Sequence, residues 1–234
     1  MRERRAVAFG SEAEAYRSGR PGYPADALRA CLPDGAERVL DLGAGTGKLT
    51  EGLLALGLGV VAVEPLDEMR ALIPAAAETL TGSAEAIPLP ATSVDAVMVG
   101  QAFHWFDRDA ALAEIVRVLR PGGRLGMLWN LLDDRSDWVR AIAEAFAAED
   151  RASLADPQQP WTGRPDLTDP DELRFAHTQP IDADGLVDNV ASRSTLILME
   201  PGRREEVLAR VRELAPGGTF ELPYICHGWR ATRP

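Results

Sequence analysis

The chain has 234 residues and a formal net charge of −11 at pH 7. That length suits one α/β domain with a real hydrophobic core, and the acidic balance argues against a nonspecific nucleic-acid or acidic-membrane surface, which needs a basic excess. No stretch approaches the roughly 20 apolar residues of a membrane span, and no apolar core follows the N-terminal arginines, so neither a membrane helix nor a signal peptide is expected.

The first part of the chain is expected to form cap helices on the edge of a sheet. A polar, alanine-rich stretch ends in a rigid turn over residues 20–24, RPGYP. Asp26 then begins a short helix that runs through Cys31. Cys31 and Cys226 are the two cysteines, and they share no metal or redox spacing, so we expect free thiols in a cytoplasmic protein.

A glycine-rich stretch follows, from Arg38 to Thr50, with the sequence RVLDLGAGTGKLT. A short apolar run ends in Asp41, three glycines follow at every second position, and leucines then recur at helical spacing. This pattern predicts a buried strand, a tight turn and a helix. Because glycine has no Cβ, such a turn lets the backbone approach a ligand, and the helix N-terminus attracts an anionic group.

Spacing separates three ligands for this turn. A Walker phosphate loop needs glycine at position 42 and Ser or Thr at position 49, where the chain has Leu42 and Leu49. The dinucleotide fingerprint G-x-G-x-x-G needs a third glycine at position 48, which is Lys48. What remains is D-x-G-x-G-x-G, and on its own this turn is compatible with any α/β protein.

An acidic residue follows the next expected strand. Val60–Val63 is apolar and is followed directly by Glu64, which lies 21 residues after Gly43. Rossmann-type folds place a carboxylate about 20 residues beyond the first glycine, because it accepts hydrogen bonds from both ribose hydroxyls. A surface Glu at a strand end is the alternative. Met69, on the following helix, would touch an adenine or pack in the core.

Two further strands are expected at Leu80–Ala84 and Asp95–Gly100. The second is followed by QAFHWF, residues 101–106. In open α/β sheets ligands bind outside the carboxyl ends of the strands, so this segment is expected to meet the ligand. Three aromatic residues and a histidine in one loop are costly to expose without a use, although some of them would staple the next helix to the sheet.

The remaining elements continue the alternation of helix and strand. Asp107 is a good N-cap for a helix that ends at RPGG, and five βα units in sequence imply a parallel sheet with right-handed crossovers. The further expected elements are a strand at Arg124–Asn130, a helix at Ser136–Asp150, a strand at Phe175–Ile181, helices at about 183–192 and 202–214, and a last strand at Thr219–Arg230. Between them, the polar, proline-broken loop 151–171 is expected to be mobile.

The turn D-x-G-x-G-x-G resembles motif I of the class I S-adenosylmethionine-dependent methyltransferases. GSAEAIPLP is similar to the family's G-x-A-E-x-L-P signature, and Arg117–Gly123 with the strand after it is similar to its post-motif region. The resemblance is strong over residues 38–130. It implies an α/β, Rossmann-like, doubly wound and mostly parallel seven-stranded sheet with an antiparallel last strand and a small lid. As a single methyltransferase domain, the chain would divide into cap helices (1–34), a cofactor-binding core (35–150), a lid and substrate region (151–218) and the last strand (219–234).

The resemblance also implies which residues bind S-adenosylmethionine. In many small-molecule members a segment like Y-x-x-x-R-P-x-Y-P closes over the cofactor, which would bring Tyr16 and Arg20 to its carboxylate or to the substrate. Ala84 and Glu85 would border the adenine. The expected cofactor-binding residues are Tyr16, Arg20, Asp41, Gly43, Ala44, Gly45, Glu64, Pro65, Met69, Ala84, Glu85, Gln101 and Ala102.

For the acceptor side, the candidates are Tyr23, His104 and Trp105. His104 would act as a base, position the substrate or be structural, whereas His177 and His227 lie in expected strands and are interpreted as structural. No Asn-Pro-Pro-Tyr motif and no cysteine follow the fourth strand, which argues against nucleic-acid amino methylation and the covalent pyrimidine mechanism.

QAFHWFD resembles a branch that includes trans-aconitate methyltransferase-like enzymes, which esterify small carboxylic acids. A carboxylate acceptor needs cations, for which the candidates are Arg164, Arg174 and Arg193.

The sequence therefore predicts an enzyme, a transferase that methylates a small molecule, at a carboxylate or hydroxyl oxygen, and releases S-adenosylhomocysteine. We expect no metal, no nucleic acid and no membrane as partners, a cytoplasmic location, and a monomer or homodimer. A non-catalytic S-adenosylmethionine-binding protein on the same fold is the main alternative, and an NAD-dependent oxidoreductase lacks its third glycine.

Overall fold

The computed structural model describes residues 19–147, 161–197 and 199–234. The chain divides into two compact units, which we describe separately. The core unit comprises Gly22–Asn130, Gln159–Phe175 and Cys226–Pro234, and the helical unit comprises Met1–Pro21, Leu131–Gln158 and Ala176–Ile225. Tyr16 lies outside the described residues. Within the described ranges, no helix is long and apolar enough to cross a membrane.

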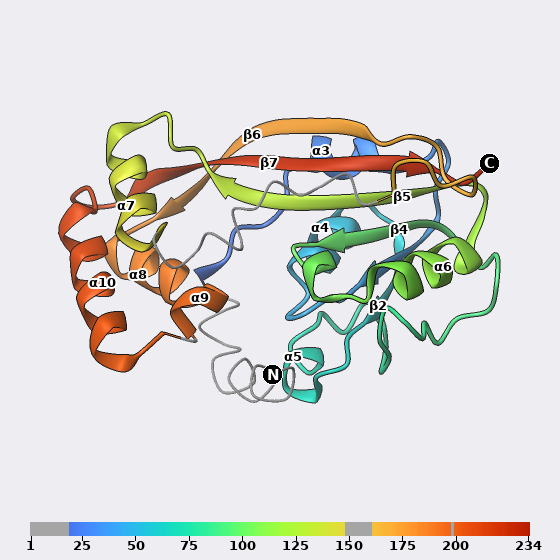
Figure 1. Cartoon of the computed structure of the whole chain (residues 1–234), viewed down its shortest axis with the longest axis horizontal. Helices are drawn as coiled ribbons and strands as arrows, with labels where there is room; N and C mark the ends of the chain where they lie inside the picture. Colours follow the sequence, from blue (N-terminus) through green and yellow to red (C-terminus); the bar gives the residue numbers. More distant parts are fainter. Residues whose placement is uncertain (1–18, 148–160, 198) are drawn as a thin grey trace. The chain divides into compact units, whose positions relative to one another are not determined.

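Seven strands of the described residues form one sheet in the order β3-β2-β1-β4-β5-β7-β6. Their bounds are β1 Arg38–Leu42, β2 Gly59–Val63, β3 Glu78–Leu80, β4 Val94–Gly100, β5 Leu119–Leu132, β6 Asp171–Ile181 and β7 Phe220–Thr232. The pairs β3–β2, β2–β1, β1–β4 and β4–β5 are parallel, and β7 runs antiparallel to β5 (Figure 1). The predicted Rossmann-like, doubly wound sheet with an antiparallel last strand is confirmed.

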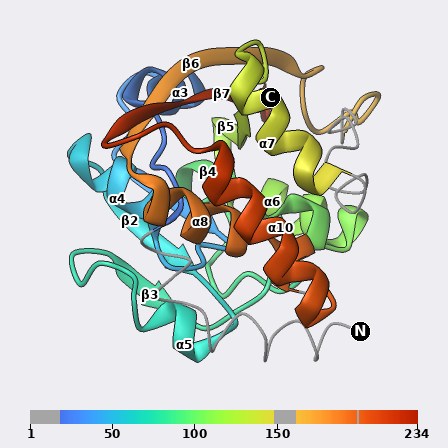
Figure 2. The same ribbon diagram turned by 90° about the vertical axis from the view of Figure 1, so that its left-hand side faces the viewer.

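The helices of the core unit are α3 Ala25–Cys31, α4 Lys48–Ala55, α5 Asp67–Arg70, α6 Arg108–Val118 and the 3-10 turn η1 Phe103–Trp105. Those of the helical unit are α7 Asp137–Ala147, α8 Ala183–Ala191, α9 Ser194–Ile197 and α10 Pro201–Leu214. Within the helical unit, α10 packs against α7 and α8 (Figure 2). Their apolar faces meet in a cluster that includes Ile142, Phe146, Leu186 and Val211.

Several element bounds differ from the sequence prediction, and β6 begins at Asp171 where Phe175 was expected. β3 ends at Leu80, before the expected end at Ala84, because residues 83–86 fold into a turn in which Ala86 N–H donates to the Ser83 carbonyl (3.2 Å). β5 begins at Leu119, so the RPGG sequence belongs to the strand. An irregularity in the pairing of β4 with β5 lets Leu119 pair with Val94 and then Arg124 with Ala96.

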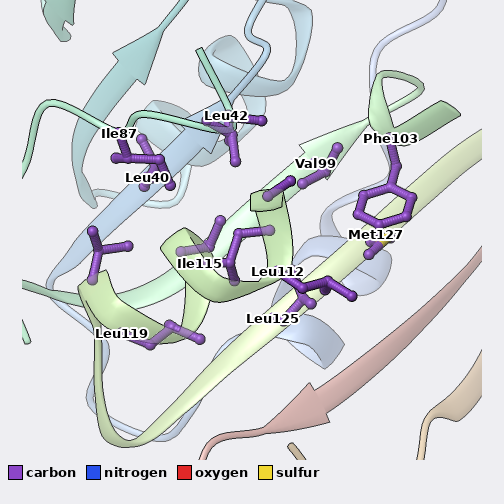
Figure 3. Packing of buried hydrophobic residues seen from close by; sticks show 14 of the residues in the cluster. Leu40, Leu42, Ile87, Val99, Phe103, Leu112, Ile115, Leu119, Leu125 and Met127 are labelled. Atoms are coloured by element: carbon purple, nitrogen blue, oxygen red, sulfur yellow. The ribbon is translucent and has the colours of Figure 1, made fainter. Parts of the chain in front are cut away.

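Helix α6 supplies much of the core on one face of the sheet. Its apolar residues at positions 112, 115 and 118 are fully buried, as the helical spacing predicts. Figure 3 shows Leu112 and Ile115 packed against side chains of the strands, among them Leu40, Val99 and Leu125. Burying one such side chain stabilises the fold by about 1.5–3 kcal/mol, so α6 is held firmly beside β4.

The polar side of α6 clamps the loop that follows β3. The Arg117 guanidinium donates to the carbonyls of Leu89 (2.7 Å) and Ile87 (2.9 Å), and the Glu114 carboxylate accepts the Ile87 N–H (2.8 Å). Arg117 also pairs with Glu114 itself. Side chains of α6 therefore hold the loop 84–90 through both its N–H and its carbonyl groups.

The expected mobile loop 151–171 is described only from residue 161 onward. Trp161 is 1% exposed and Leu167 is 4% exposed, and both belong to the α6-side core of the sheet. Thr168 N–H donates to the Thr232 carbonyl (2.9 Å), and Thr232 N–H donates to the Thr168 hydroxyl (3.0 Å). This part of the predicted loop is packed and paired, because its two apolar residues find a core that the local polar composition does not reveal.

Candidate functional site

The glycine turn between β1 and α4 has the backbone that its composition predicts. Gly43, Gly45 and Gly47 have φ of +72°, +56° and +89°, all in the left-handed region that side chains disfavour. The N–H groups of Gly43 and Ala44 both donate to the Val63 carbonyl, at 2.9 and 3.1 Å. The turn is therefore tied to the carboxyl end of β2.

The space around each glycine differs. A Cβ at Gly43 would lie 2.9 Å from Cβ of Ala102 and 3.1 Å from Cζ of Phe106, so this glycine lets the turn pack directly on the segment after β4. A Cβ at Gly45 would meet nothing closer than the Met69 sulfur at 3.9 Å. Among the described residues, the face of the turn at Gly45 is therefore open around this Cβ position.

Glu64, directly after β2, is 6% exposed, and its carboxylate faces the glycine turn. Oε2 accepts the Gly45 N–H and Oε1 accepts the Leu66 N–H, each at 2.9 Å. Burial raises the pKa of Glu64, while these two backbone hydrogen bonds and Arg70 oppose the rise. Since a carboxylate offers about four acceptor positions, each oxygen can still accept one further hydrogen bond.

Asp41, two residues before Gly43, is almost completely buried. Its Oδ2 accepts the Thr50 hydroxyl (2.6 Å), and among the described residues its buried Oδ1 has no hydrogen-bond partner. Burial raises the pKa of Asp41 to about 7. The floor of the turn thus carries a buried carboxyl with one unused acceptor.

The loop after β3 reaches the same end of the sheet. Ala84 is buried, and the Glu85 Oε1 accepts the Asp107 N–H at 2.8 Å. Asp107 in turn caps α6 by accepting the Ala110 N–H (3.2 Å). Glu85 therefore ties the loop after β3 to the segment after β4, a link that the sequence did not suggest.

The segment after β4 begins with a strained residue. Gln101 has φ +53°, and its N–H donates to the Leu128 carbonyl (2.9 Å). A left-handed conformation costs a non-glycine residue about 1–2 kcal/mol. Such strain is found where the surrounding structure enforces a functional geometry.

The aromatic residues that follow divide into buried and accessible ones. Phe103 is 9% exposed and packs edge-on against Phe106, with ring centroids 5.7 Å apart. His104 is exposed, and its ring lies 4.5 Å from that of the half-buried Trp105. The segment therefore presents an imidazole and an indole above the carboxyl end of β4.

Tyr23 reaches the same strand end from the N-terminal side. A Cβ at Gly100 would lie 2.5 Å from the Tyr23 hydroxyl oxygen, so the ring covers the last residue of β4. The carbonyl of the preceding Gly22 accepts a hydrogen bond from Nδ2 of Asn130 (3.0 Å). The glycine at position 100 was the available sequence signal for this close approach.

The remaining sequence candidates each have contacts of their own. Arg20 belongs to the helical unit, where its guanidinium donates to the hydroxyl (2.9 Å) and carbonyl (3.1 Å) of Ser192. Of the proposed carboxylate-binding arginines, Arg164 pairs with Asp166 (2.7 Å), Arg174 pairs with Glu172 (2.7 Å), and Arg193 lies 4.9 Å from the Phe146 ring centre.

The two strand histidines both contact other side chains. His227, 4% exposed on β7, lies 2.6 Å from the Glu172 carboxylate, and His177 on β6 stacks on Tyr224. Both lie in strands, as predicted. Among the described residues, no group of three or more His, Cys, Asp or Glu side chains is arranged to hold a metal ion.

The arrangement fits a nucleoside that carries a vicinal diol. The open face at Gly45 leaves space, Glu64 keeps acceptors for hydroxyl groups, and the buried Met69 sulfur borders the same space. The exposed residues beyond β4 adjoin it, because the turn packs directly on Ala102.

Comparison with known proteins agrees with this arrangement. A family model described as a methyltransferase domain matches residues 40–127. An uncharacterised methyltransferase of Mycobacterium tuberculosis is 43% identical over 243 residues, covering 97% of this chain and 96% of that protein. A malonyl-[acyl-carrier protein] O-methyltransferase of Methylococcus capsulatus is 42% identical over 98 residues, 38% of this chain and 35% of that protein. A structure assigned as a type II methyltransferase from Anaeromyxobacter dehalogenans shares the fold, with a TM-score of 0.65 at 22% identity, over 92% of this chain and 97% of that one.

Proposed function

Because this chain belongs to the class I S-adenosylmethionine-dependent methyltransferases, we propose that it methylates a small molecule at an oxygen atom, a carboxylate or a hydroxyl. The observation that carries the proposal is the contact between the glycine turn and the segment after β4. A Cβ at Gly43 would lie 2.9 Å from Ala102, and His104 follows two residues later. A ligand held on the turn thus lies close to an exposed imidazole.

S-adenosylmethionine supplies a methyl group on a sulfonium, which is its own leaving group. The protein supplies binding and orientation, which can be worth roughly 7–11 kcal/mol of a methyl-transfer barrier. We propose that the residues that hold this cofactor are Tyr16, Arg20, Asp41, Gly43, Ala44, Gly45, Glu64, Pro65, Met69, Ala84, Glu85, Gln101 and Ala102.

Within this set, three side chains have distinct tasks. The Glu64 carboxylate accepts hydrogen bonds from ribose hydroxyls while it holds the Gly45 N–H. Glu85 keeps the loop after β3 against α6 through the Asp107 N–H, and so fixes the wall of the site beside Ala84. Gln101 turns the chain sharply out of β4 and directs the aromatic segment over the strand end.

On the acceptor side, we propose Tyr23, His104 and Trp105 as the substrate-binding residues. All three lie at the carboxyl end of β4, and Tyr23 lies over its last residue. A hydroxyl acceptor must lose a proton, for which His104 is an accessible base. A carboxylate acceptor has already lost its proton and needs only positioning.

An oxygen acceptor is favoured by two likenesses. The Methylococcus capsulatus relative is by name an O-methyltransferase, although it matches only 98 residues of this chain. The segment QAFHWFD resembles enzymes that esterify small carboxylic acids.

We also propose that the chain is a single methyltransferase domain in which region 151–218 determines the substrate. It acts in the cytoplasm as a monomer or homodimer. The two buried free cysteines favour the cytoplasmic location. The net charge of −11 disfavours nucleic acid as a partner.

The direct test is a screen of small carboxylic acids, phenols and amines for release of S-adenosylhomocysteine. We expect turnover with an acid or a phenol. Turnover with amines alone would overturn oxygen methylation. Tight binding of S-adenosylhomocysteine without turnover on any acceptor would favour a binding protein.

His104→Gln distinguishes the two kinds of oxygen acceptor. With a hydroxyl acceptor, kcat should fall by roughly 10²–10⁴ and the wild-type rise of kcat with pH through an imidazole titration should disappear. With a carboxylate acceptor, the loss should appear mainly in KM, with no imidazole limb in kcat. In both cases the affinity for S-adenosylhomocysteine should be unchanged. Wild-type kcat and KM in this variant would remove His104 from the site.

A further inference from the structure

Trp129, on β5 in the core unit, lies beside the segment that follows β4. Gly100 pairs with Leu128 across the two strands, and the Gln101 N–H donates to the Leu128 carbonyl (2.9 Å). Trp129 is the next residue along β5, one position beyond the last pair with β4. Because β4 and β5 are parallel, Trp129 lies at the edge of the sheet where the acceptor end of the site begins.

The indole of Trp129 lies on the same face of the sheet as the aromatic segment. Side chains alternate along a strand, and the fully buried Leu125 and Met127 belong to the core on the α6 side. In Figure 3 the Phe103 ring lies beside Met127. Trp129 continues this row and packs against the same core, as does Trp105, but both are only half-buried. The row of buried side chains therefore reaches the rim of the core at Trp129.

A buried row of side chains supports Trp129 from β7 and β6. Trp229, which is 3% exposed, meets Trp129 edge-on, with ring centroids 5.7 Å apart and planes at 75°. The buried His227 ring lies 4.4 Å from that of Trp229, and its Nε2 lies 2.6 Å from the Glu172 carboxylate, which also pairs with Arg174. All of these residues belong to the core unit. The indole of Trp129 is thus held in place while part of it stays accessible.

A fixed, half-buried indole is suited to contact with an aromatic ring. Aromatic rings pair edge-to-face or offset, with centroids about 4.5–7 Å apart, and such a pair is favourable beyond the apolar area that it buries. The segment after β4 brings the half-buried Trp105 and the exposed His104 to the same edge of the sheet. An aliphatic acceptor would gain only from the apolar area, whereas an aromatic one also gains from ring geometry.

We propose that Trp129 is a specificity-determining residue that selects acceptors whose carboxylate or hydroxyl group is attached to an aromatic ring. The inference rests on the proposed methyl transfer at the end of β4, and it names the chemical class of the acceptor. Binding of the ring beside Trp129 can be measured without turnover.

The test uses two matched pairs of small molecules, benzoate with cyclohexanecarboxylate and phenol with cyclohexanol. Within each pair the head group and the ring size are the same, and only the aromaticity differs. Each compound is titrated into the full chain in the presence of S-adenosylhomocysteine. The protein is labelled with 5-fluorotryptophan, so that each of its five tryptophans gives a fluorine resonance, which is assigned from single Trp→Phe variants.

We expect the Trp129 resonance to shift saturably with the aromatic member of at least one pair, at severalfold lower concentration than with its saturated counterpart. Trp161, which is 1% exposed, is the internal reference and should not shift. If neither benzoate nor phenol shifts the Trp129 resonance, or if the affinities are equal within both pairs, the proposal is overturned.

Two variants at this position separate recognition of the ring from packing. Trp129→Phe keeps an aromatic ring, whereas Trp129→Leu keeps an apolar side chain without one. Both lose part of the contact with Trp229 and should melt below the wild type. By ligand-detected NMR, the preference for the aromatic probe should persist in Trp129→Phe and disappear in Trp129→Leu. Equal preferences in the two variants would show that Trp129 acts only through packing, which contradicts the proposal.

Release of S-adenosylhomocysteine from S-adenosylmethionine keeps the two proposals distinguishable. If the aromatic probes bind beside Trp129 but no acceptor supports turnover, the proposed function fails, and the selectivity for aromatic rings remains as a binding property. If turnover occurs only with the saturated acid or alcohol, the proposed function stands and the role of Trp129 fails alone.

Discussion

Replacing Glu64 by glutamine tests the cofactor site with almost no change of shape. In the native protein each carboxylate oxygen accepts one backbone N–H at 2.9 Å, from Gly45 and from Leu66. A glutamine keeps one acceptor oxygen, but its amide nitrogen would face the second N–H. That buried donor would be left unsatisfied, which costs about 1–3 kcal/mol of folding stability.

The loss of the charge also weakens binding of a ribose. A hydrogen bond to a charged acceptor contributes about 1.5–3 kcal/mol. At 1.36 kcal/mol for each factor of ten, the dissociation constant for S-adenosylhomocysteine should rise about 10- to 150-fold. Isothermal calorimetry measures this directly, and a thermal melt without ligand measures the change in stability.

Glu78→Gln is the matched control. Glu78 lies on the adjacent strand β3, with a half-exposed side chain that pairs with Arg38 at 3.0 Å. Exposed ion pairs of this kind contribute about 0–1 kcal/mol, so neither stability nor affinity should change appreciably. If Glu64→Gln melts earlier yet binds S-adenosylhomocysteine as tightly as the wild type, Glu64 only holds the turn and the assignment of the ribose site is refuted.

Three further changes probe the same end of the sheet. Gly45→Val places a branched side chain at φ +56°, in the open space beside Met69; it should abolish S-adenosylhomocysteine binding, and wild-type affinity by calorimetry would remove the turn from the site. Burial holds the pKa of Asp41 at about 7, above its ordinary 3.8, so the native state binds this proton more tightly than the unfolded chain, and stability falls as the pH rises from about 4 to about 7. Asp41→Asn should flatten that part of the profile of melting temperature against pH, and an unaltered slope would contradict the shift. Gln101→Gly and Thr92→Gly both relieve the strain of a left-handed backbone, at φ +53° and +52°. Each should alter stability by no more than about 1 kcal/mol, but only Gln101→Gly should weaken S-adenosylhomocysteine binding. Equal affinities in the two variants would count against a functional role for the strain at Gln101.

Local patterns in the sequence were enough to predict most of the sheet. The apolar run before Asp41, the alternate glycines and the acidic residue 21 positions after Gly43 are close in sequence, so their spacing reports the strand, turn and strand that contain them. The same holds for α6, whose buried face follows the helical period. The resemblance to methyltransferases also rests on these short-range motifs, and for that reason it covers residues 38–130.

Contacts between residues distant in sequence were decided only by the tertiary structure. Nothing near Glu85 indicates that its carboxylate caps the backbone at Asp107, and nothing near Trp161 indicates that it is buried. Some local pairs were also missed, because Arg164 and Arg174, proposed to bind a carboxylate, pair with acidic residues only two positions away. The composition gives the numbers of charged residues, but which cation pairs with which anion depends on side-chain direction in the fold.

The hydrogen bond between Asn189 and Gly19 shows why the sequence alone could not predict such contacts. A glycine at position 19 has many uses, and an asparagine at position 189 has many more, so neither residue alone predicts the other. Their hydrogen bond joins residues 170 positions apart, and it exists because the fold brings the end of α8 to the chain just before Pro21. Periodicity and turn chemistry depend on residues a few positions apart, so the sequence shows them directly. Buried polar groups that are distant in sequence find their partners only in the folded chain.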